Sequence, residues 1–286
     1  MMQTILDVKN LSVSFGGIKA LQDITFDVPK ESITAIIGPN GAGKTTVFNC
    51  LTGFYRASGG ALTFHGDGKA HNLIELLGEK LRFSDLGRLD KLPRKFYYKF
   101  FGGSFRIAEL GVARTFQNIR LFKQMSVLEN LLVAQHKLVN RNLISGLILT
   151  PGYRAAEKKA IEHACYWLDL VGLRGEANRT AGELPYGHQR RLEIARAMCT
   201  NAKLLCLDEP AAGLNHEETR SLAQLILRLR KDHKITVLVI EHDMALVMNI
   251  SDKIVVLDRG EVIAIGKPAE IQTNKKVLAA YLGEEA

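Results

Sequence analysis

Hydrophobic and polar residues alternate along the first thirty positions of the chain. The apolar side chains form two runs separated by Gly16-Gly17: Leu6, Val8, Leu11, Val13 and Phe15, then Leu21, Ile24, Phe26 and Val28. A period near two is typical of strands with one buried face, and a glycine pair is typical of a tight turn. We therefore predict two antiparallel strands, and the same pattern resumes at residues 61–64.

The rest of the chain alternates between short apolar runs and segments with helical spacing. The runs at 33–37, 204–207, 235–240 and 254–257 are continuous, as expected of strands covered on both faces. Helical spacing is found at 44–51, 126–173 and 217–231, and we expect a basic amphipathic helix after Arg190. This alternation predicts a parallel sheet with crossover helices. Residues 253–265 predict a hairpin that turns at 258–260, before a last helix that ends at Leu282.

The composition is that of a globular protein, with 47% hydrophobic and 24% charged residues over 286 positions. No apolar run is long enough to cross a bilayer, and the first residues lack the layout of a secretory signal, so we expect no export. The cysteines are far apart and have apolar neighbours: Cys50, Cys165, Cys199 and Cys206. We expect buried free thiols in a reducing cytoplasm rather than a disulfide or metal site.

About half of the formal net charge of +8 lies in one segment. Residues 66–108 carry nine Lys or Arg against five Asp or Glu, include an aromatic stretch at 96–101, and lack a clear period. We interpret them as an insertion with some helix. The insertion would either contact anionic lipid or a membrane partner, or form a plain surface loop, and we favour the surface loop.

One motif predicts phosphate binding. Between a predicted strand and a predicted helix stands the pattern GxxxxGK[ST], formed by Gly38, Pro39, Asn40, Gly41, Ala42, Gly43, Lys44, Thr45 and Thr46. Glycines let backbone N–H groups turn towards an anion, and the N-terminus of the helix adds partial positive charge. We expect Lys44 to contact the β- and γ-phosphates of a nucleotide, and the Thr45 hydroxyl to bind Mg²⁺.

A second motif, LLCLDE at residues 204–209, is an apolar strand that ends in two acids. The carboxyl ends of central strands are where α/β sheets bind ligands. We expect Asp208 to hold Mg²⁺ and Glu209 to orient or deprotonate the attacking water. Two further residues, His242 after the strand at 235–240 and Gln117 in RTFQN, are unremarkable alone, because a lone histidine after a strand is more often structural.

Taken in order, these motifs resemble those of the ATP-binding cassette (ABC) family. The family's phosphate loop, Gln loop, signature, acidic strand end with D-loop, and switch histidine are matched by GPNGAGKTT, Gln117, LPYGHQRR, LLCLDEP with AAGLN, and IEHD. The resemblance implies an α/β fold: a phosphate-loop NTPase core with a parallel sheet, an N-terminal antiparallel β subdomain and an α-helical subdomain. It also implies ATP and Mg²⁺ as cofactors and ATP hydrolysis coupled to transport.

The resemblance also implies roles for individual residues. Glu209, His242 and Gln117 match catalytic positions, and the metal would be held by Thr45, Gln117 and Asp208. Phe15 matches the aromatic residue that stacks on adenine, with a plain strand core position as the alternative. The signature would contact the nucleotide held by an opposing subunit, and its matching residues are Leu184, Pro185, Tyr186, Gly187 and His188.

Longer stretches are similar to the LivG-type ATPase of branched-chain amino-acid uptake systems, among them VFNCLTGFY, RTFQNIRLF, LENLLVAQH, IEHDMALVM and AAYLGE. This implies a single ABC ATPase domain over 1–286, with the insertion at 66–108, a helical subdomain at about 118–190 and a C-terminal hairpin and helix at 253–286. The implied partners are two membrane permeases, a second ATPase subunit of the LivF type or a second copy, and indirectly a periplasmic binding protein. The implied location is the cytoplasmic face of the membrane, and no nucleic acid is expected.

The signature departs from the family's usual LSGGQ. Pro185 lacks a hydroxyl and an N–H group, and Tyr186 replaces a glycine, whereas Gly187 and the helix that begins near it remain. In the D-loop, Asn215 stands where the family often has Asp. We therefore hypothesise that the two ATP sites of a dimer differ in rate.

Three other kinds of function are alternatives to the import of branched-chain amino acids. An exporter or a urea-type importer would use a similar ATPase. A nucleic-acid- or ribosome-acting ABC factor would fit the basic charge, but the chain has neither a second cassette nor a long coiled coil. A non-hydrolysing module is disfavoured, because Lys44, Asp208, Glu209 and His242 are all present.

Overall fold

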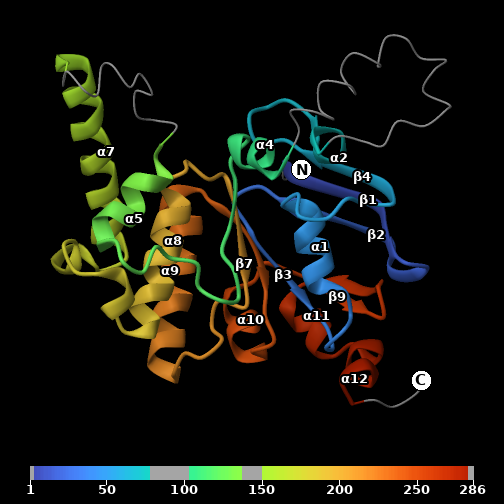
Figure 1. The fold of residues 1–286 in the computed structure, drawn as a ribbon. Coiled ribbons are helices and arrows are strands. Elements are labelled where there is room, and N and C mark those ends of the chain that lie inside the picture. The colour runs from blue at the N-terminus through green and yellow to red at the C-terminus, as the bar shows by residue number, and fades with distance from the viewer. Residues whose placement is uncertain (1–2, 78–102, 137–149, 283–286) are drawn as a thin grey trace, which may run out of the picture.

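The smaller of two sheets forms one side of the molecule (Figure 1). The computed structural model describes residues 3–77, 103–136 and 150–282. This sheet is antiparallel, in the order β2-β1-β4-β5, and consists of β1 (Thr4–Phe15), β2 (Ile18–Pro29), β4 (Gly59–Phe64) and β5 (His71–Asn72). Gly16 and Gly17 make the turn between β1 and β2, both with positive φ. The predicted antiparallel strands are therefore confirmed.

The larger sheet has six strands in the order β10-β9-β3-β8-β7-β6. Its members are β3 (Ile33–Ile37), β6 (Val112–Arg114), β7 (Leu204–Asp208), β8 (Thr236–Ile240), β9 (Lys253–Asp258) and β10 (Glu261–Gly266). Every pair is parallel except the β9–β10 hairpin. Every residue of β3, β7 and β8 is buried, which explains their continuous apolar sequences. The predicted parallel sheet and hairpin are confirmed.

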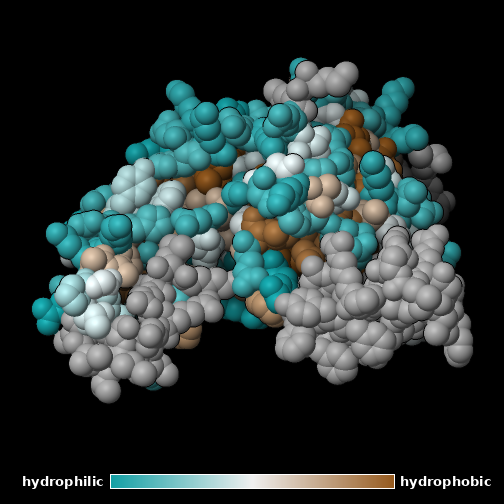
Figure 2. Space-filling model, turned by 90° about the horizontal axis from the view of Figure 1, so that it is seen from above, coloured by the Kyte–Doolittle hydropathy of each residue, from teal (hydrophilic) through white to brown (hydrophobic). Residues whose placement is uncertain are grey.

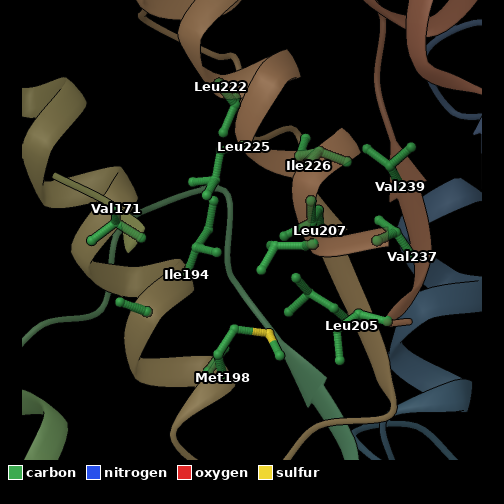
Figure 3. Packing of buried hydrophobic residues seen from close by; sticks show 14 of the residues in the cluster. Val171, Ile194, Met198, Leu205, Leu207, Leu222, Leu225, Ile226, Val237 and Val239 are labelled. Carbon is green, nitrogen blue, oxygen red and sulfur yellow. The ribbon is translucent and has the colours of Figure 1, made fainter. Parts of the chain in front are cut away.

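Alternate side chains of the larger sheet enter two separate cores. On one face, Leu205 and Leu207 of β7 pack against α8 (Tyr186–Met198) and α9 (His216–His233), as Figure 3 shows. On the other face, Leu204 and Cys206 pack with α1 (Lys44–Leu51), which lies between the two sheets (Figure 1). The sheet is therefore held from both sides, with the carboxyl ends of its parallel strands left at one edge.

A group of helices lies beside the larger sheet: α5 (Val127–Ala134), α7 (Pro151–Leu170) and α8, with the short 3₁₀ turns η2 (Arg174–Glu176) and η3 (Ala181–Glu183). The prediction of helix over 126–173 is confirmed where the chain is described, and residues 137–149 lie outside the described residues. Helix α8 begins at Tyr186, which agrees with the helix expected to begin near Gly187 in the signature, whereas the start after Arg190 expected from helical spacing was wrong. Arg190 is fully buried, since it pairs with Glu193 one turn later at 2.8 Å between Nη1 and Oε2.

The ends of the predicted insertion belong to the core. Residues 71–72 form β5, and among the described residues helices α2 (Leu73–Leu76) and α4 (Ser104–Glu109) follow. The hydrophobic cluster around α1 buries four residues of this segment: Leu73, Leu76, Leu77 and Ile107. The prediction of a surface loop over all of 66–108 was therefore wrong at both ends of the segment. Residues 78–102, with most of the basic and aromatic side chains, lie outside the described residues.

The C-terminal segment contains two helices after the hairpin, α11 (Pro268–Gln272) and α12 (Lys275–Leu282), where one was predicted. The break has a local cause, because the Asn274 side chain accepts a hydrogen bond from the Lys276 N–H at 3.0 Å and so starts a new helix. A further helix, α10 (Met244–Ile250), is capped by Asp243, whose side chain accepts from the Leu246 N–H.

The cysteines are free thiols, as expected, but one of them is only partly buried. Burial raises the pKa of Cys50, Cys199 and Cys206 to about 12. Within the described residues, no helix combines the length and hydrophobicity needed to cross a membrane. Seen from above, the face that carries α4 is mostly hydrophilic, with hydrophobic residues gathered near its middle (Figure 2).

Candidate active site

The phosphate loop lies between the end of β3 and the start of α1, as predicted. Gly38, Gly41 and Gly43 all have positive φ, at 148°, 83° and 99°. Side chains are excluded at two of them, because a Cβ on Gly38 would lie 2.0 Å from the Leu257 carbonyl oxygen and one on Gly43 would lie 2.6 Å from Leu21 Cδ2. Glycine is therefore required at these two positions, and a glycine-rich loop is the kind that can turn backbone N–H groups towards an anion.

Lys44 is the buried cation of this loop. Its Nζ donates to the carbonyl oxygens of Gly38 at 2.7 Å and Pro39 at 2.9 Å, and the residue is 8% exposed. Burial lowers the pKa of Lys44, while the charge of Glu209 acts in the opposite direction. The first turn of α1 has no side-chain cap and no acidic residue. A helix N-terminus without an acid, above a buried ammonium, fits a polyphosphate.

The acidic pair ends β7 beside the loop. Asp208 is 5% exposed, and its Oδ2 accepts from Arg114 Nη2 at 2.7 Å, so Oδ1 is the oxygen that could bind a metal ion. The Thr45 hydroxyl is on the exposed face of α1. One carboxylate, one hydroxyl and phosphate oxygens suit Mg²⁺, which prefers few protein ligands. The donors present thus fit the predicted ion, and no group of three or more His, Cys, Asp or Glu side chains converges as a metal site in the described parts of the chain.

The structure brings the three predicted catalytic residues together. Gln117 Nε2 donates to Glu209 Oε2 at 2.7 Å, and His242 Nδ1 lies 3.9 Å from the same oxygen. Glu209 has a left-handed backbone with φ of 45°, and its N–H donates to the Ile240 carbonyl oxygen at 2.9 Å. Thus the ends of β7 and β8 and the loop after β6 meet around one carboxylate, which can accept a proton from water or orient it.

The signature segment forms the start of α8. Leu184 is buried, Pro185 is the N-cap residue without a side-chain cap bond, and Tyr186 is 44% exposed. Gly187 packs closely against Glu218, since a Cβ there would lie 2.5 Å from Glu218 Oε1 and would displace that side chain. His188 is partly buried, and its Nδ1 has no partner among the described residues. No hydrogen bond in the described chain joins this segment to Gly38–Thr46.

Phe15 is 46% exposed at the end of β1, and its ring stands edge-on to Tyr55, with 5.2 Å between the ring centroids. The alternative of a strand core position is therefore wrong. In the D-loop, Asn215 has a structural role: its Oδ1 accepts from the Glu218 N–H at 2.9 Å and caps α9. Asn or Asp can fill this position equally well.

Sequence reasoning missed four charged residues that hold the site. Glu241 is 1% exposed and accepts the N–H groups of Ala211 at 2.7 Å and His242 at 3.0 Å, so it ties the loop after β7 to the loop after β8. Burial raises the pKa of Glu241. The other three charged residues are Arg114, Arg190 and Glu193. The sequence signal that could have identified them is their position next to the Gln117 motif and the signature motif.

Comparisons with known proteins agree with this geometry. The family model for ABC transporters matches residues 21–212, and one described as branched-chain amino acid ATP-binding cassette transporter matches residues 261–286. The chain is 49% identical over 284 residues to the high-affinity branched-chain amino acid transport ATP-binding protein BraF of Pseudomonas aeruginosa. It is 47% identical over 284 residues to the protein LivG of Escherichia coli K12, which carries the same description. Both alignments cover 99% of this chain and 100% of the relative.

Solved structures confirm the predicted fold class. An ATP-binding cassette of an ABC transporter in its ADP conformation superposes with a TM-score of 0.76 at 31% identity, covering 99% of this chain and 100% of that one. A nucleotide-free cassette gives a TM-score of 0.74 at 29% identity, covering 98% and 99%. With its phosphate loop, acidic strand end and signature helix in place, the chain belongs to the ABC transporter family and is an ATPase subunit of that type.

Proposed function

We propose that this chain hydrolyses ATP with Mg²⁺ to drive the import of branched-chain amino acids. The observation that carries the solute class is the identity of 47–49% over nearly the full length to ATP-binding proteins of branched-chain amino acid transport. The match of residues 261–286 supports the same class, because this segment lies outside the general ABC match at 21–212.

In this proposal the nucleotide site uses the residues described above. Phe15 stacks on the base, the loop Gly38–Thr46 binds the phosphates, and Lys44 exchanges its two carbonyl partners for phosphate oxygens. Asp208 and Thr45 would hold Mg²⁺, with Gln117 as a further ligand, and the ion would supply charge neutralisation at the phosphates. Glu209 orients the attacking water and His242 stabilises the charge that develops on the transferred phosphoryl group.

The partners follow from the family: membrane permeases and a second ATPase subunit with which the chain dimerises. We propose that the second subunit is of the LivF type, that a periplasmic binding protein delivers the solute, and that the chain lies on the cytoplasmic face of the membrane. A cavity of about 300 Å³ beside the Gln loop supports a permease contact there, since it is lined by Phe54, Phe105 and Phe116. Exposed aromatic rings around a cavity are typical of a protein interface.

We further propose that the two ATP sites of the dimer are unequal. Pro185 contributes neither a hydroxyl nor an N–H group, so the signature of this subunit lacks the serine hydroxyl of the usual LSGGQ, whereas the N–H groups of the first turn of α8 remain. The measurement is single-turnover hydrolysis with Glu209→Gln in this subunit alone and the corresponding change in its partner alone. Unequal losses support the proposal, and equal losses contradict it.

The transport proposal is tested by uptake of labelled leucine, isoleucine and valine in cells that lack this subunit. Cells that regain the wild-type chain are expected to recover uptake, and cells that receive the Glu209→Gln variant are not. Uptake of urea is measured in parallel. Recovery of urea uptake without recovery of leucine uptake would overturn the assigned solute class while leaving the ATPase in place.

A further inference from the structure

Helix α8 contains a fully buried pair of opposite charges that the ATPase site does not itself require. Arg190 is the largest fully buried side chain in the described part of the chain, and Glu193 is 2% exposed. The two groups are joined at 2.8 Å between Nη1 and Oε2. Burial raises the pKa of Glu193 even though Arg190 opposes it. Buried ion pairs seldom add net stability, because both charges lose their water.

The pair is bonded to the Gln loop on both sides of Gln117. Arg190 donates from Nη1 to the Phe116 carbonyl oxygen at 2.7 Å and from Nη2 to the Gln117 carbonyl oxygen at 2.8 Å. Glu193 Oε1 accepts the N–H of Phe116 at 3.4 Å and that of Arg120 at 3.2 Å. Four backbone groups of residues 116–120 are therefore fixed to one helix by two side chains.

The two ends of this arrangement lie at functional positions. At one end, the Gln117 side chain donates to Glu209, the carboxylate that directly follows β7. At the other end, Arg190 Nη2 is 3.4 Å from the hydroxyl of Tyr186, the first residue of α8. A displacement of Gln117 must therefore move α8, or else break charge-assisted bonds inside the protein.

We propose that Arg190 and Glu193 are positioning residues that couple Gln117 to the start of α8, so that the Gln loop and the signature segment move as one unit. The proposal rests on the ATPase function above and adds the residues that carry the coupling. Neither residue touches nucleotide in this account. Each acts by fixing the backbone that places the Gln117 amide against Glu209.

The test uses Arg190→Lys in the full chain. Lysine keeps the positive charge but is a single ammonium, so it cannot bond the Phe116 and Gln117 carbonyl oxygens in the planar, two-pronged geometry of a guanidinium. The matched control is Arg191→Lys, on the next position of the same helix, where Arg191 donates to Ser221 on α9 rather than to the Gln loop. Glu193→Gln, which keeps the size of the side chain, is the second variant if Arg190→Lys does not fold.

The first measurement is hydrogen exchange of the nucleotide-free chain. We expect the amides of Phe116 and Arg120 to exchange about tenfold faster in Arg190→Lys, which corresponds to about 1.4 kcal/mol, and to be unchanged in Arg191→Lys. Unchanged exchange in both variants would overturn the proposal, because the Gln loop would then be held without Arg190.

The second measurement is a double-mutant cycle on kcat with Gln117→Ala. If Arg190 acts through Gln117, Arg190→Lys lowers kcat about tenfold in the wild-type chain and less than about twofold in the Gln117→Ala chain. Equal losses in the two backgrounds would show that Arg190 is only structural and would overturn the proposal. Binding of a fluorescent ATP analogue distinguishes failure of the proposed ATPase function from failure of the proposed coupling. A wild-type chain that does not bind the analogue refutes the ATPase function. Normal binding together with an additive double-mutant cycle refutes only the coupling.

Discussion

Arg114 offers the sharpest stability prediction, because its guanidinium joins three elements at the carboxylate of Asp208. It donates to Asp208 Oδ2 at 2.7 Å, to Asn49 Oδ1 at 2.7 Å and to Thr52 Oγ1 at 3.0 Å. The side chains of Arg114 and Asp208 are each 7% exposed. Arg114→Met fills much of the same space but leaves a buried carboxylate without its cation, and it removes the donor shared by Asn49 and Thr52.

Breaking a buried pair from one side costs about 3–5 kcal/mol. We therefore expect the free energy of unfolding, measured in urea, to fall by roughly this amount in Arg114→Met. A change of 1 kcal/mol shifts the Tm of a chain of this size by about 2–4 °C, so the Tm should fall by roughly 6–20 °C. The control is Arg230→Met, because Arg230 and Asp252 form a more exposed pair, with side chains 33% and 39% exposed. Its expected cost is only about 0–1 kcal/mol.

Additive losses of stability in a double variant of Arg114 and Asp208 would refute the reasoning. Asp208→Asn removes the charge that Arg114→Met leaves unpaired, so the double variant should be less destabilised than the sum of the single variants, by about 2 kcal/mol. A sum within about 0.5 kcal/mol of the double variant would show that the two groups do not interact strongly. A loss below about 1 kcal/mol in Arg114→Met alone would contradict the assigned burial cost.

Three further predictions concern the loop, one histidine and the thiols. Gly38→Ala should abolish binding of a fluorescent ATP analogue, because its Cβ would lie 2.0 Å from a carbonyl oxygen, and binding at wild-type affinity would contradict the loop geometry. Burial lowers the pKa of His163 in the folded chain below its ordinary value of 6.5. Between these two pKa values the unfolded chain binds a proton at His163 and the folded chain does not. The free energy of unfolding should therefore fall as the pH drops through 6.5 towards the lower folded pKa. Thermal melts should show this loss in the wild type and less of it in His163→Gln; equal losses would exclude His163 as its source. A thiol reagent at pH 8 should label only Cys165 in the native chain, and rapid labelling of two or more sites would contradict the burial of Cys50, Cys199 and Cys206.

The sequence predicted the elements around the phosphate loop closely, because local chemistry decides them. A continuous β-branched run gave β3 at Ile33–Ile37, and the glycine-rich turn set the start of α1 at Lys44. The acids after β7 were also predictable, since the strand ends where two charges follow four apolar residues. The meeting of Gln117, Glu209 and His242 followed from the family resemblance, and the sheet order explains it, because β6, β7 and β8 are neighbours.

The remaining features depend on contacts between distant segments. The sequence pattern places Arg190 just before a basic amphipathic helix, and its burial could not be predicted because its partners include backbone groups 73–74 residues away. The pairing of Arg114 with Asp208 spans 94 positions and arises only once β6 lies beside β7. The ends of the basic segment also misled prediction, since Leu73 and Ile107 face a core that forms only after both segments meet α1.

The central claim is that the loop at Gly38–Thr46 holds ATP while Glu209 drives its hydrolysis. The most direct measurement is ATP affinity alongside phosphate release for the full chain, Lys44→Ala and Glu209→Gln. We predict that Lys44→Ala loses both binding and hydrolysis, whereas Glu209→Gln binds ATP about as tightly as the wild type and releases almost no phosphate. Phosphate release at the wild-type rate by either variant would contradict the account.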